Sequence, residues 1–518
     1  MVAKATTLDG LLRGAVARYK DRPFLIFEEV VMSYVDFDSA VERAASGLLA
    51  LGVMPGDRVA IWMSNRIEWP IAQLAVTRCG AVLVPLNTRL RTEDLSHALR
   101  DSGAVAIVTQ SRSEEFSYLD IIREIVNEDR CPALRKVIVV GEVEQDPGLF
   151  VAWEDMMRAG DDLQVEPKPC DDPEQMAYIL YTSGTTSLPK GVMLSHANLN
   201  NCRNLAGEFR ERDVIFLVYP LFAITGCHNT ILAGLVAGAT IVINERFHPL
   251  AALELIERHR CTVFSGVIAV VDQIVSLPSF TPKRVATLWR AIVFPRRPQH
   301  IPLLRKLGVE VSSTGYGMTE TSGPLTQVRS MDESTFQCEG HPWPGNEIRI
   351  SGPDGRDMAI GEAGAILARS PQVMLGYFNN LEATAKAIDS QGWLNTGDVG
   401  RLNADGTLTW IGRSNEVYKC SGFNVAASEI EAFLVGHPAI AEVAVIGVAD
   451  RQKGEVGAAF VVPKSGHTLT QEDVEAFCRN RIASYKIPGH VIALDAFPKT
   501  ASGKVRKVEL VALHFPER

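Results

Sequence analysis

Apolar runs that read as buried strands alternate with helical patterns along the first part of the chain. Between residues 24 and 108, the runs at 57–63 (DRVAIWM) and 81–87 (AVLVPLN) alternate with amphipathic stretches such as 39–51 and 92–103. Strands and helices that alternate in this way are typical of a mostly parallel sheet covered by helices. The strand pattern returns at residues 137–140, 239–243, 261–264 and 291–294. The sequence therefore predicts a large α/β body made of several subdomains.

The pattern changes after Gly397, where short strands surround a hairpin turn predicted at Asp405-Gly406. A helix is expected to follow, because Ser428 and Glu431 have the spacing of a capping box. Gly436 fits the left-handed residue that often ends a helix. These features indicate a small α+β unit near the end of the chain.

A second helix of that unit is predicted from Thr470 and Asp473, which also have capping-box spacing. We therefore expect an α/β class with two domains joined by a hinge at residues 412–416. The N-terminal body spans residues 1–414, and the C-terminal α+β domain spans residues 415–518.

Composition excludes several classes of protein. The formal charge of -9 lacks the basic excess that sequence-independent nucleic-acid binding requires. Nine cysteines without a C-x-x-C pair indicate buried thiols rather than disulfides or a zinc site. Residues 214–244 hold no charged side chain, but Pro220, Thr225 and His228 interrupt their apolar run, so no membrane span is predicted. No apolar signal segment opens the chain, and the cytoplasm is the expected compartment.

The stretch YTSGTTSLPK, residues 181–190, combines small residues, hydroxyls and one cation. A Walker phosphate loop is disfavoured, because that pattern requires Gly directly before the Lys, whereas Pro189 precedes Lys190 here. The composition still suits a polyphosphate, since Gly184 allows close backbone approach and the hydroxyls donate hydrogen bonds. Composition alone fits an exposed flexible loop equally well.

Four further motifs follow in order: STGYGMTET at 313–321, GWLNTGDVG at 392–400, GRSNEVYKCSGFNV at 412–425 and PKTASGKVRK at 498–507. Together with residues 181–192 they resemble the adenylate-forming superfamily. That superfamily includes acyl-CoA synthetases, firefly luciferase and the adenylation domains of peptide synthetases. The resemblance runs through nearly the whole chain and is nearest to the acid:CoA ligases.

The resemblance implies a role for several side chains. Tyr316 is expected to stack on adenine, Thr319 to bind phosphate, and Glu320 to hold Mg²⁺. Asp398 resembles the acceptor for both ribose hydroxyls, and Arg413 adds a nucleotide contact. The nucleotide-binding residues that it implies are Thr182, Ser183, Gly184, Thr185, Thr186, Lys190, Gly315, Tyr316, Gly317, Met318, Thr319, Asp398 and Arg413.

Catalysis is assigned by the same resemblance to Lys504, Glu320, Thr319 and Lys190. Lys504 resembles the lysine that bridges the substrate carboxylate and the α-phosphate of ATP. A cation between two anions offsets their repulsion and stabilises the transition state. Ser421, Gly422 and Phe423 match the segment that lines a tunnel for coenzyme A.

The implied reaction has two halves. A carboxylic acid and ATP give an acyl adenylate and pyrophosphate, and the thiol of coenzyme A then gives a thioester and AMP. The family's small domain rotates between the halves, and Asn415 stands at the position of the hinge. Two alternatives stay open: an enzyme that loads a separate carrier protein, and a nonenzymatic protein that binds the nucleotide or the acyl adenylate. The chain is expected to act as a monomer or a homodimer.

The chain departs from the family's pattern around the acyl pocket. Ala223 follows Pro-Leu-Phe where relatives often have His, and Pro295–Pro298 replaces a Gly-rich loop. Arg296 and Arg297 in that loop either face solvent or reach the pocket and pair with a polar or anionic group of the substrate. The acid is left open among aryl, medium-chain, fused-ring and dicarboxylic acids. The predicted pocket residues are Phe222, Ala223, Gly226, Cys227, Val267, Phe294, Arg296 and Arg297.

Overall fold

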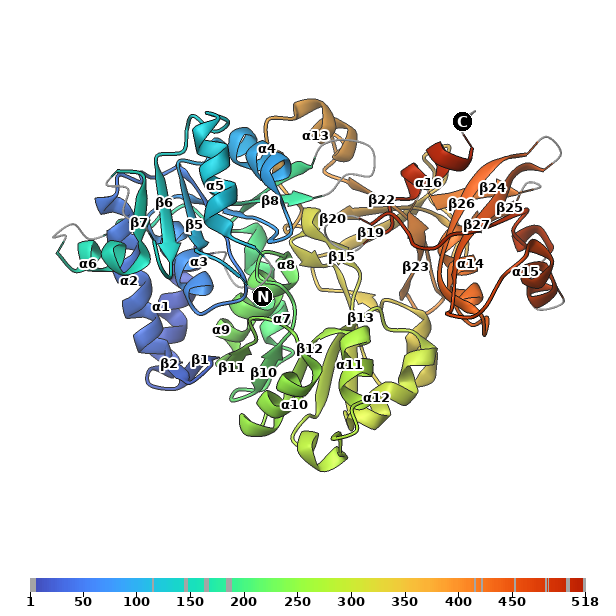
Figure 1. Cartoon of the computed structure of the whole chain (residues 1–518), viewed down its shortest axis with the longest axis horizontal. Coiled ribbons are helices and arrows are strands. Elements are labelled where there is room, and N and C mark those ends of the chain that lie inside the picture. The colour runs from blue at the N-terminus through green and yellow to red at the C-terminus, as the bar shows by residue number, and fades with distance from the viewer. Residues whose placement is uncertain are drawn as a thin grey trace. The chain divides into compact units, whose positions relative to one another are not determined.

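The structure is a computed structural model that describes residues 6–113, 116–143, 148–162, 167–182, 189–413, 416–420, 423–450, 453–479, 482, 484–499 and 504–515. It divides into two compact units, whose elements are labelled in Figure 1. Unit 1 consists of the described residues up to Asn346 together with Arg369–Ile388, and unit 2 of Glu347–Ala368 together with the described residues from Asp389 onward.

The larger sheet of unit 1 carries nine strands within the described residues, in the order β18-β17-β14-β13-β12-β10-β11-β1-β2. Its central strands, from β1 through β11, β10, β12 and β13 to β14, pair in parallel, which confirms the expectation from the alternating pattern. The strands are β1 (Pro23–Phe27), β2 (Val30–Ser33), β10 (Val214–Leu217), β11 (Thr240–Ile243), β12 (Val263–Val267), β13 (Arg290–Phe294), β14 (Val311–Thr314), β17 (Thr326–Arg329) and β18 (His341–Pro342).

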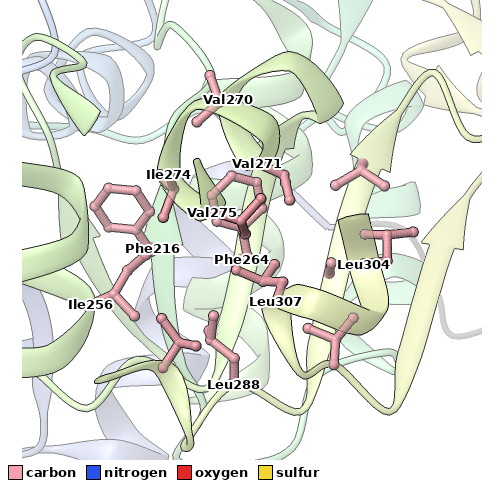
Figure 2. Packing of buried hydrophobic residues seen from close by; sticks show 14 of the residues in the cluster. Phe216, Ile256, Phe264, Val270, Val271, Ile274, Val275, Leu288, Leu304 and Leu307 are labelled. Carbon is pink, nitrogen blue, oxygen red and sulfur yellow. The ribbon is translucent and has the colours of Figure 1, made fainter. Parts of the chain in front are cut away.

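Helices cover both faces of this sheet. On one face, side chains of α11 and α12 pack on Phe216 and Phe264 in a closed hydrophobic cluster (Figure 2). On the other face, Gly234 of α9 lies directly against Ile241, so a larger residue would collide with the strand. The helices are α7 (Cys202–Ala206), α8 (Ile224–Gly226), a π-helical turn η2 (Cys227–Leu232), α9 (Ala233–Ala237), α10 (Pro249–Arg258), α11 (Ile268–Val275) and α12 (Ile301–Leu307).

The second sheet of unit 1 has the order β21-β9-β8-β4-β3-β5-β6-β7 in the part of the chain that is described. Its strands are β3 (Arg58–Trp62), β4 (Val82–Pro85), β5 (Ala106–Gln110), β6 (Lys136–Val140), β7 (Phe150–Ala152), β8 (Met176–Thr182), β9 (Lys190–Ser195) and β21 (Gly376–Tyr377). The remaining helices of unit 1 are α1 (Leu8–Tyr19), α2 (Tyr34–Ala50), α3 (Glu68–Arg78), α4 (Thr92–Ser102), α5 (Tyr118–Asn127), α6 (Trp153–Asp162) and α13 (Leu381–Ala387).

Two local interactions hold the helices of this region. A capping box between Ser33 and Asp36 begins α2, where the Ser33 hydroxyl accepts from the Asp36 backbone N–H at 3.1 Å. Arg78, buried at the end of α3, forms ion pairs with Asp9 at 2.5 Å and Asp38 at 2.6 Å. These buried contacts tie α1, α2 and α3 together.

Unit 2 holds two antiparallel arrangements. The first has the order β19-β20-β22-β23 and the second β25-β24-β27-β26, with β28 beside β27 in parallel. The strands are β19 (Glu347–Ser351), β20 (Gly364–Arg369), β22 (Leu394–Leu402), β23 (Leu408–Arg413), β24 (Val417–Cys420), β25 (Phe423–Ala426), β26 (Ile440–Asp450), β27 (Gly454–Pro463) and β28 (His490–Ala493). The helices are α14 (Ala427–Leu434), α15 (Gln471–Cys478) and α16 (Lys507–His514).

The local predictions for unit 2 have mixed outcomes. The hairpin turn at Asp405-Gly406 and the capping box of Thr470 with Asp473 are confirmed. The capping box of Ser428 and Glu431 is wrong. Ser428 lies inside α14 and its hydroxyl donates to the Ile411 carbonyl at 2.7 Å, while the Glu431 carboxylate accepts from the distant Val445 N–H.

Gly436 does not have the left-handed conformation that was expected after the first helix of unit 2, so that prediction is wrong. The mixed α/β class with a smaller α+β part is confirmed. The boundary after residue 414 stays a prediction, and the hinge residues Ser414 and Asn415 lie outside the described residues. No described helix is long and apolar enough to cross a membrane.

Candidate active site

A cavity of about 300 Å³ lies on one face of the nine-stranded sheet of unit 1. Arg290, Ile292 and Phe294 alternate along β13 and line it, whereas Ala291 points to the hydrophobic cluster on the other face. The neighbouring strands contribute hydroxyl side chains, Ser265 from β12 and Ser313 and Thr314 from β14. The remaining walls are mostly apolar: Leu205, Phe209, Ile224, Met318, Pro324 and Trp343.

One end of this cavity carries a buried ion pair. The Arg290 guanidinium, 1% exposed, donates from Nη2 to Glu208 Oε2 at 3.1 Å and from Nε to the Ser313 hydroxyl at 3.0 Å. Its Nη1 donates to the Glu208 backbone carbonyl. Burial lowers the pKa of Arg290 to about 10, and the nearby Glu208 and Asp213 carboxylates oppose that shift. Arg290 is therefore still a cation at neutral pH.

A further part of the cavity wall is formed by the motif STGYGMTET, whose first residue, Ser313, accepts from Arg290. β14 ends at Thr314, and Gly315, Gly317 and Met318 line the cavity. A Cβ atom at Gly315 would lie 2.1 Å from the Thr326 carbonyl oxygen, so this position accepts only glycine. Tyr316, predicted to stack on adenine, is 6% exposed as a whole residue, and its backbone N–H donates to the Thr326 hydroxyl at 2.9 Å.

Glu320 and Lys190, two predicted catalytic residues, meet at a tyrosine that the sequence analysis did not select. Thr319 begins a short 3-10 turn, η5 (Thr319–Thr321), on which the Glu320 carboxylate is nearly buried. The Tyr377 hydroxyl donates to Glu320 Oε1 at 3.0 Å. The Lys190 ammonium lies 5.1 Å from the centre of the Tyr377 ring. Tyr377 thus holds both side chains.

No sequence signal pointed to Tyr377, because Gly-Tyr pairs occur in many strands and nothing near it in the sequence carries chemistry. Its importance follows from the pairing of β21 with β9, in which Tyr377 stands beside Val192, two residues after Lys190.

The predicted phosphate loop connects two strands that pair with each other. Thr182, at the end of β8, lies opposite Lys190, at the start of β9. The Tyr181 hydroxyl before it donates to Asp101 at 2.6 Å, and burial raises the pKa of Tyr181 above its usual value. The predicted loop residues Ser183, Gly184, Thr185 and Thr186 lie outside the described residues.

In unit 2, the structure brings Asp398 and Arg413 together. They face each other across the β22 and β23 pair, with Arg413 Nε 3.0 Å from Asp398 Oδ1. Asp398 is 3% exposed, and Arg413 also donates to the Thr396 carbonyl at 3.1 Å. A carboxylate held in this way by a cation offers acceptor oxygens at a defined position, which suits a vicinal diol.

Lys504 is exposed and directly precedes Val505, which forms a β-bridge with Lys499. Two predicted tunnel residues, Ser421 and Gly422, lie outside the described residues. Phe423 begins β25, where its backbone pairs with Cys420.

Most of the predicted acyl-pocket residues do not line the cavity. Phe294 does, whereas Phe222, Ala223 and Val267 lie outside its lining. A Cβ at Gly226 would lie 2.2 Å from the Pro220 carbonyl, and Cys227 is fully buried, with its carbonyl accepting from Gln73. On this helical segment the cavity is instead lined by Ile224, Thr225, Asn229 and Thr230. Gly226 and Cys227, which were predicted to line the pocket, stand on the opposite side of the helix, because neighbours in a helical sequence point in different directions.

Both expectations for Arg296 are wrong. Its side chain is fully buried, and its guanidinium donates to the carbonyl oxygens of Ser330 and Thr335 at 2.5 and 2.6 Å and lies over the Phe336 ring. Burial lowers its pKa to about 10. Arg297 is partly exposed and pairs with Glu339 at 2.8 Å. Neither arginine lines the cavity, and both bind groups in residues 330–339 instead.

We expect Arg296→Ala to reduce the free energy of unfolding by about 3 kcal/mol, because it leaves a void and two buried carbonyl groups without donors. The urea midpoint measures this loss. The exposed Arg305→Ala, at the end of α12, is the control and should change stability by less than about 0.5 kcal/mol. In folded Arg296→Ala, the ratio of KM values for monoacids and diacids should stay unchanged. An altered ratio would contradict the purely structural role.

Comparison with known proteins places the whole chain in one family. The model of the AMP-binding enzyme matches residues 12–378, and that of the AMP-binding enzyme C-terminal domain matches residues 429–504. The chain belongs to the AMP-binding enzyme family. The resemblance to adenylate-forming enzymes is thereby confirmed. The chain is an adenylate-forming ligase.

Three relatives illustrate the likeness of this AMP-binding enzyme to others. A Mycobacterium tuberculosis CoA ligase for a propanoyl group on a methyl-dioxo-octahydroindenyl ring is 34% identical over 522 residues, with 98% of this chain and 99% of that protein covered. The 4-coumarate–CoA ligase 3 of Oryza sativa subsp. japonica is 30% identical, with 99% and 93% covered. The o-succinylbenzoate CoA synthetase of Bacillus subtilis, solved with its acyl adenylate, has a TM-score of 0.82 and 27% identity, with 96% and 97% covered.

Proposed function

We propose that this AMP-binding enzyme is an ATP-dependent acid:CoA ligase. The observation that carries the proposal is the cavity that begins at Gly315, Gly317 and Met318 of the nucleotide motif and continues along β13 as an apolar pocket. An acyl group in this cavity has its carboxylate next to the motif that is assigned to the nucleotide. Small-molecule sites are commonly concave, mostly apolar and equipped with a few polar groups, as this one is.

In the first half-reaction, a carboxylate oxygen of the acid attacks the α-phosphorus of ATP. A new bond forms between the carboxylate oxygen and the α-phosphorus. The bond between the α-phosphorus and the oxygen that bridges to the β-phosphate breaks, and pyrophosphate leaves. We assign Tyr316 to the adenine, Asp398 with Arg413 to the ribose, and Lys190 to the leaving pyrophosphate. Lys504 is assigned a position beside the reacting carboxylate and α-phosphate, where a cation offsets the repulsion between the two anions.

In the second half-reaction, the thiol of coenzyme A attacks the acyl carbon of the adenylate. The carbon–sulfur bond forms, the carbon–oxygen bond to AMP breaks, and the thiol proton is released. CoA ligases among the relatives support coenzyme A as the acceptor. Ser421, Gly422 and Phe423 are proposed to border its path.

Glu320 fits a Mg²⁺ ion of the kind that accompanies ATP. Mg²⁺ in nucleotide sites is usually held by one or two carboxylates together with substrate phosphates. The described residues contain no cluster of three or more His, Cys, Asp or Glu side chains that could bind a metal alone, so Glu320 would hold the ion together with substrate phosphates and water. When bound, the ion supplies positive charge that screens the phosphates.

Measuring products with and without coenzyme A tests the proposal. Incubation with ATP, Mg²⁺ and a panel of carboxylic acids should release pyrophosphate, and coenzyme A should convert the adenylate into a thioester. Pyrophosphate without thioester would contradict the CoA ligase and favour loading of a carrier protein. Absence of pyrophosphate with every acid would reject adenylation and favour a nonenzymatic binding protein.

Tyr377 is expected to position Glu320 without touching the substrate. We predict that Tyr377→Phe raises the Mg²⁺ concentration for half-maximal activity about tenfold, because a hydrogen bond to a charged oxygen contributes roughly 1.5 to 3 kcal/mol. A Mg²⁺ titration of pyrophosphate release measures this shift. Tyr19→Phe, which deletes a hydroxyl bonded to the remote Val236 carbonyl, is the matched control. An unchanged Mg²⁺ dependence in Tyr377→Phe would contradict the positioning role.

A further inference from the structure

We propose that the preferred acid of this enzyme carries a neutral oxygen, in a ketone or hydroxyl group, at the end opposite its carboxylate, and that Arg290 binds this oxygen. The inference names the substrate class of the proposed acid:CoA ligase and rests on that function. It follows from the position, the spare donors and the charge balance of the Glu208–Arg290 pair in the cavity.

The pair stands on the side of the cavity where Ser313, the first residue of the nucleotide motif, accepts from Arg290. β13 and β14 run in parallel with Ile292 opposite Ser313, so Phe294 and Gly315 lie at the same edge of the sheet. Arg290 begins β13, and its guanidinium reaches the Ser313 hydroxyl, two residues before Gly315. A strand rises about 3.3 Å per residue, which places the guanidinium about 7 Å along the strand from Gly315. An acid with its carboxylate at Gly315 therefore extends along β13 toward Arg290.

Arg290 has N–H groups to spare. A guanidinium carries five N–H donors, and the described residues accept three of them: two at Glu208 and one at the Ser313 hydroxyl. The Ser313 hydroxyl, which also lines the cavity, can donate its own hydrogen. Buried donors without an acceptor destabilise a site by about 1 to 3 kcal/mol each, so an acceptor atom of the ligand is favoured at this end.

The local charges favour a neutral acceptor over a carboxylate. The Arg290 cation is matched by Glu208, and Arg329 also lies 3.6 Å from the Glu208 carboxylate. Asp213, which accepts from the Trp289 indole at 2.9 Å, adds a second negative charge. Arg290 and Arg329 balance Glu208 and Asp213, whereas Arg210, which stacks on Trp289, is exposed to solvent. A further carboxylate buried here would therefore lack a matching buried charge. A ketone or hydroxyl oxygen needs only the hydrogen bonds.

Some of the other polar groups of the cavity have partners within the protein: Tyr219 donates to the Gly266 carbonyl at 2.7 Å, and Thr230 donates to the Thr225 carbonyl at 2.9 Å. Thr225, Thr314 and Gln327 also line the cavity, but none of these groups carries the positive charge of Arg290. Beside the guanidinium, Ile292 and Phe209 offer apolar surface. The structure therefore favours an otherwise apolar acid that carries one oxygen at the level of Arg290.

A matched set of acids tests the proposal on the wild-type enzyme. Straight-chain acids of several lengths are compared in three forms: unsubstituted, with a ketone next to the far end, and with a second carboxylate there. Pyrophosphate release and thioester formation are measured for each. At the chain length that gives the highest activity, kcat/KM should be at least about tenfold higher for the keto acid than for the unsubstituted acid or the dicarboxylic acid of the same length. A difference of this size is expected for one hydrogen bond to a charged donor.

Glu208→Gln supplies a second, independent readout. The substitution keeps the length of the side chain and an acceptor for Arg290, but it removes the matching negative charge. We expect the kcat/KM ratio of dicarboxylic to keto acid to rise at least about tenfold, a gain that a loss of folding cannot produce. Glu257→Gln, at an exposed pair with Arg284, is the matched control and should leave the ratio unchanged.

The outcomes separate this inference from the function on which it rests. Equal kcat/KM for keto and unsubstituted acids at every length would overturn the role of Arg290 while the ligase function stands. A wild-type preference for dicarboxylic acids would also overturn it, as would an unchanged ratio in Glu208→Gln. No pyrophosphate with any acid would reject the ligase function itself, and the inference with it.

Discussion

Lys504→Ala should lower the rate of acyl adenylate formation about 10²- to 10³-fold and leave thioester formation from supplied acyl adenylate largely intact. The carboxylate and the α-phosphate are both anions, and a cation between them stabilises the charge that develops in the transition state, with losses of this size when one such donor is removed. The second half-reaction joins a thiol to an activated acyl group and does not bring these anions together. Single-turnover pyrophosphate release and thioester formation from synthetic adenylate measure the two halves separately.

The neighbouring Lys499→Ala is the matched control for Lys504→Ala. Lys499 is a partly exposed lysine of the same unit, 2.6 Å from Glu442, and its removal changes the net charge equally. Exposed ion pairs of this kind contribute about 0 to 1 kcal/mol, so both half-reactions should stay near the wild-type rate. Equal losses of both half-reactions in Lys504→Ala would refute the division of labour.

Glu320→Gln should reduce adenylation about 10²-fold or more and raise the Mg²⁺ concentration that the enzyme requires. The amide keeps the shape of the side chain and an acceptor for the Tyr377 hydroxyl, but it removes the negative charge that favours a cation. A metal ion can contribute several kcal/mol to the stabilisation of charge on a phosphoryl oxygen, which corresponds to this loss. The measurement is pyrophosphate release across a Mg²⁺ series.

Glu333→Gln, an exposed carboxylate at the start of the η6 turn (Glu333–Gln337), should behave like the wild type in the same series. A Glu320→Gln enzyme with wild-type activity at low Mg²⁺ would exclude Glu320 as a metal ligand. Excess Mg²⁺ should restore part of the lost activity, because phosphate oxygens still bind the ion.

The sequence predicted the motifs but not the walls of the pocket. Residues 313–321 carry several chemically distinctive side chains within one short segment, and close approach of the backbone requires Gly315. This segment therefore indicates its role without any other part of the chain. The positions of Cys227 and Arg296 in the chain also predicted that they line the acyl pocket. Packing turned Cys227 away from the cavity and enclosed Arg296 among backbone carbonyls.

The residues that were missed depend on contacts between distant segments. Tyr377 lies 57 residues from Glu320 in the sequence, and the Arg290 and Glu208 side chains are separated by 82. Each is an ordinary tyrosine, arginine or glutamate in its local context. Their roles arise where β21 pairs with β9 and where β13 faces the end of α7, and both contacts are made only in the folded chain.

The sequence by itself determined the alternation of strands and helices, the adenylate-forming family and the motif residues such as Glu320, Asp398 and Lys504. These features are local, because hydrophobic period and short motifs are set by neighbours along the chain. The tertiary structure alone decided which side chains surround the cavity and that Arg290, paired with Glu208, forms part of its wall. Burial and long-range pairing determine which way a side chain points, and a single sequence does not record them.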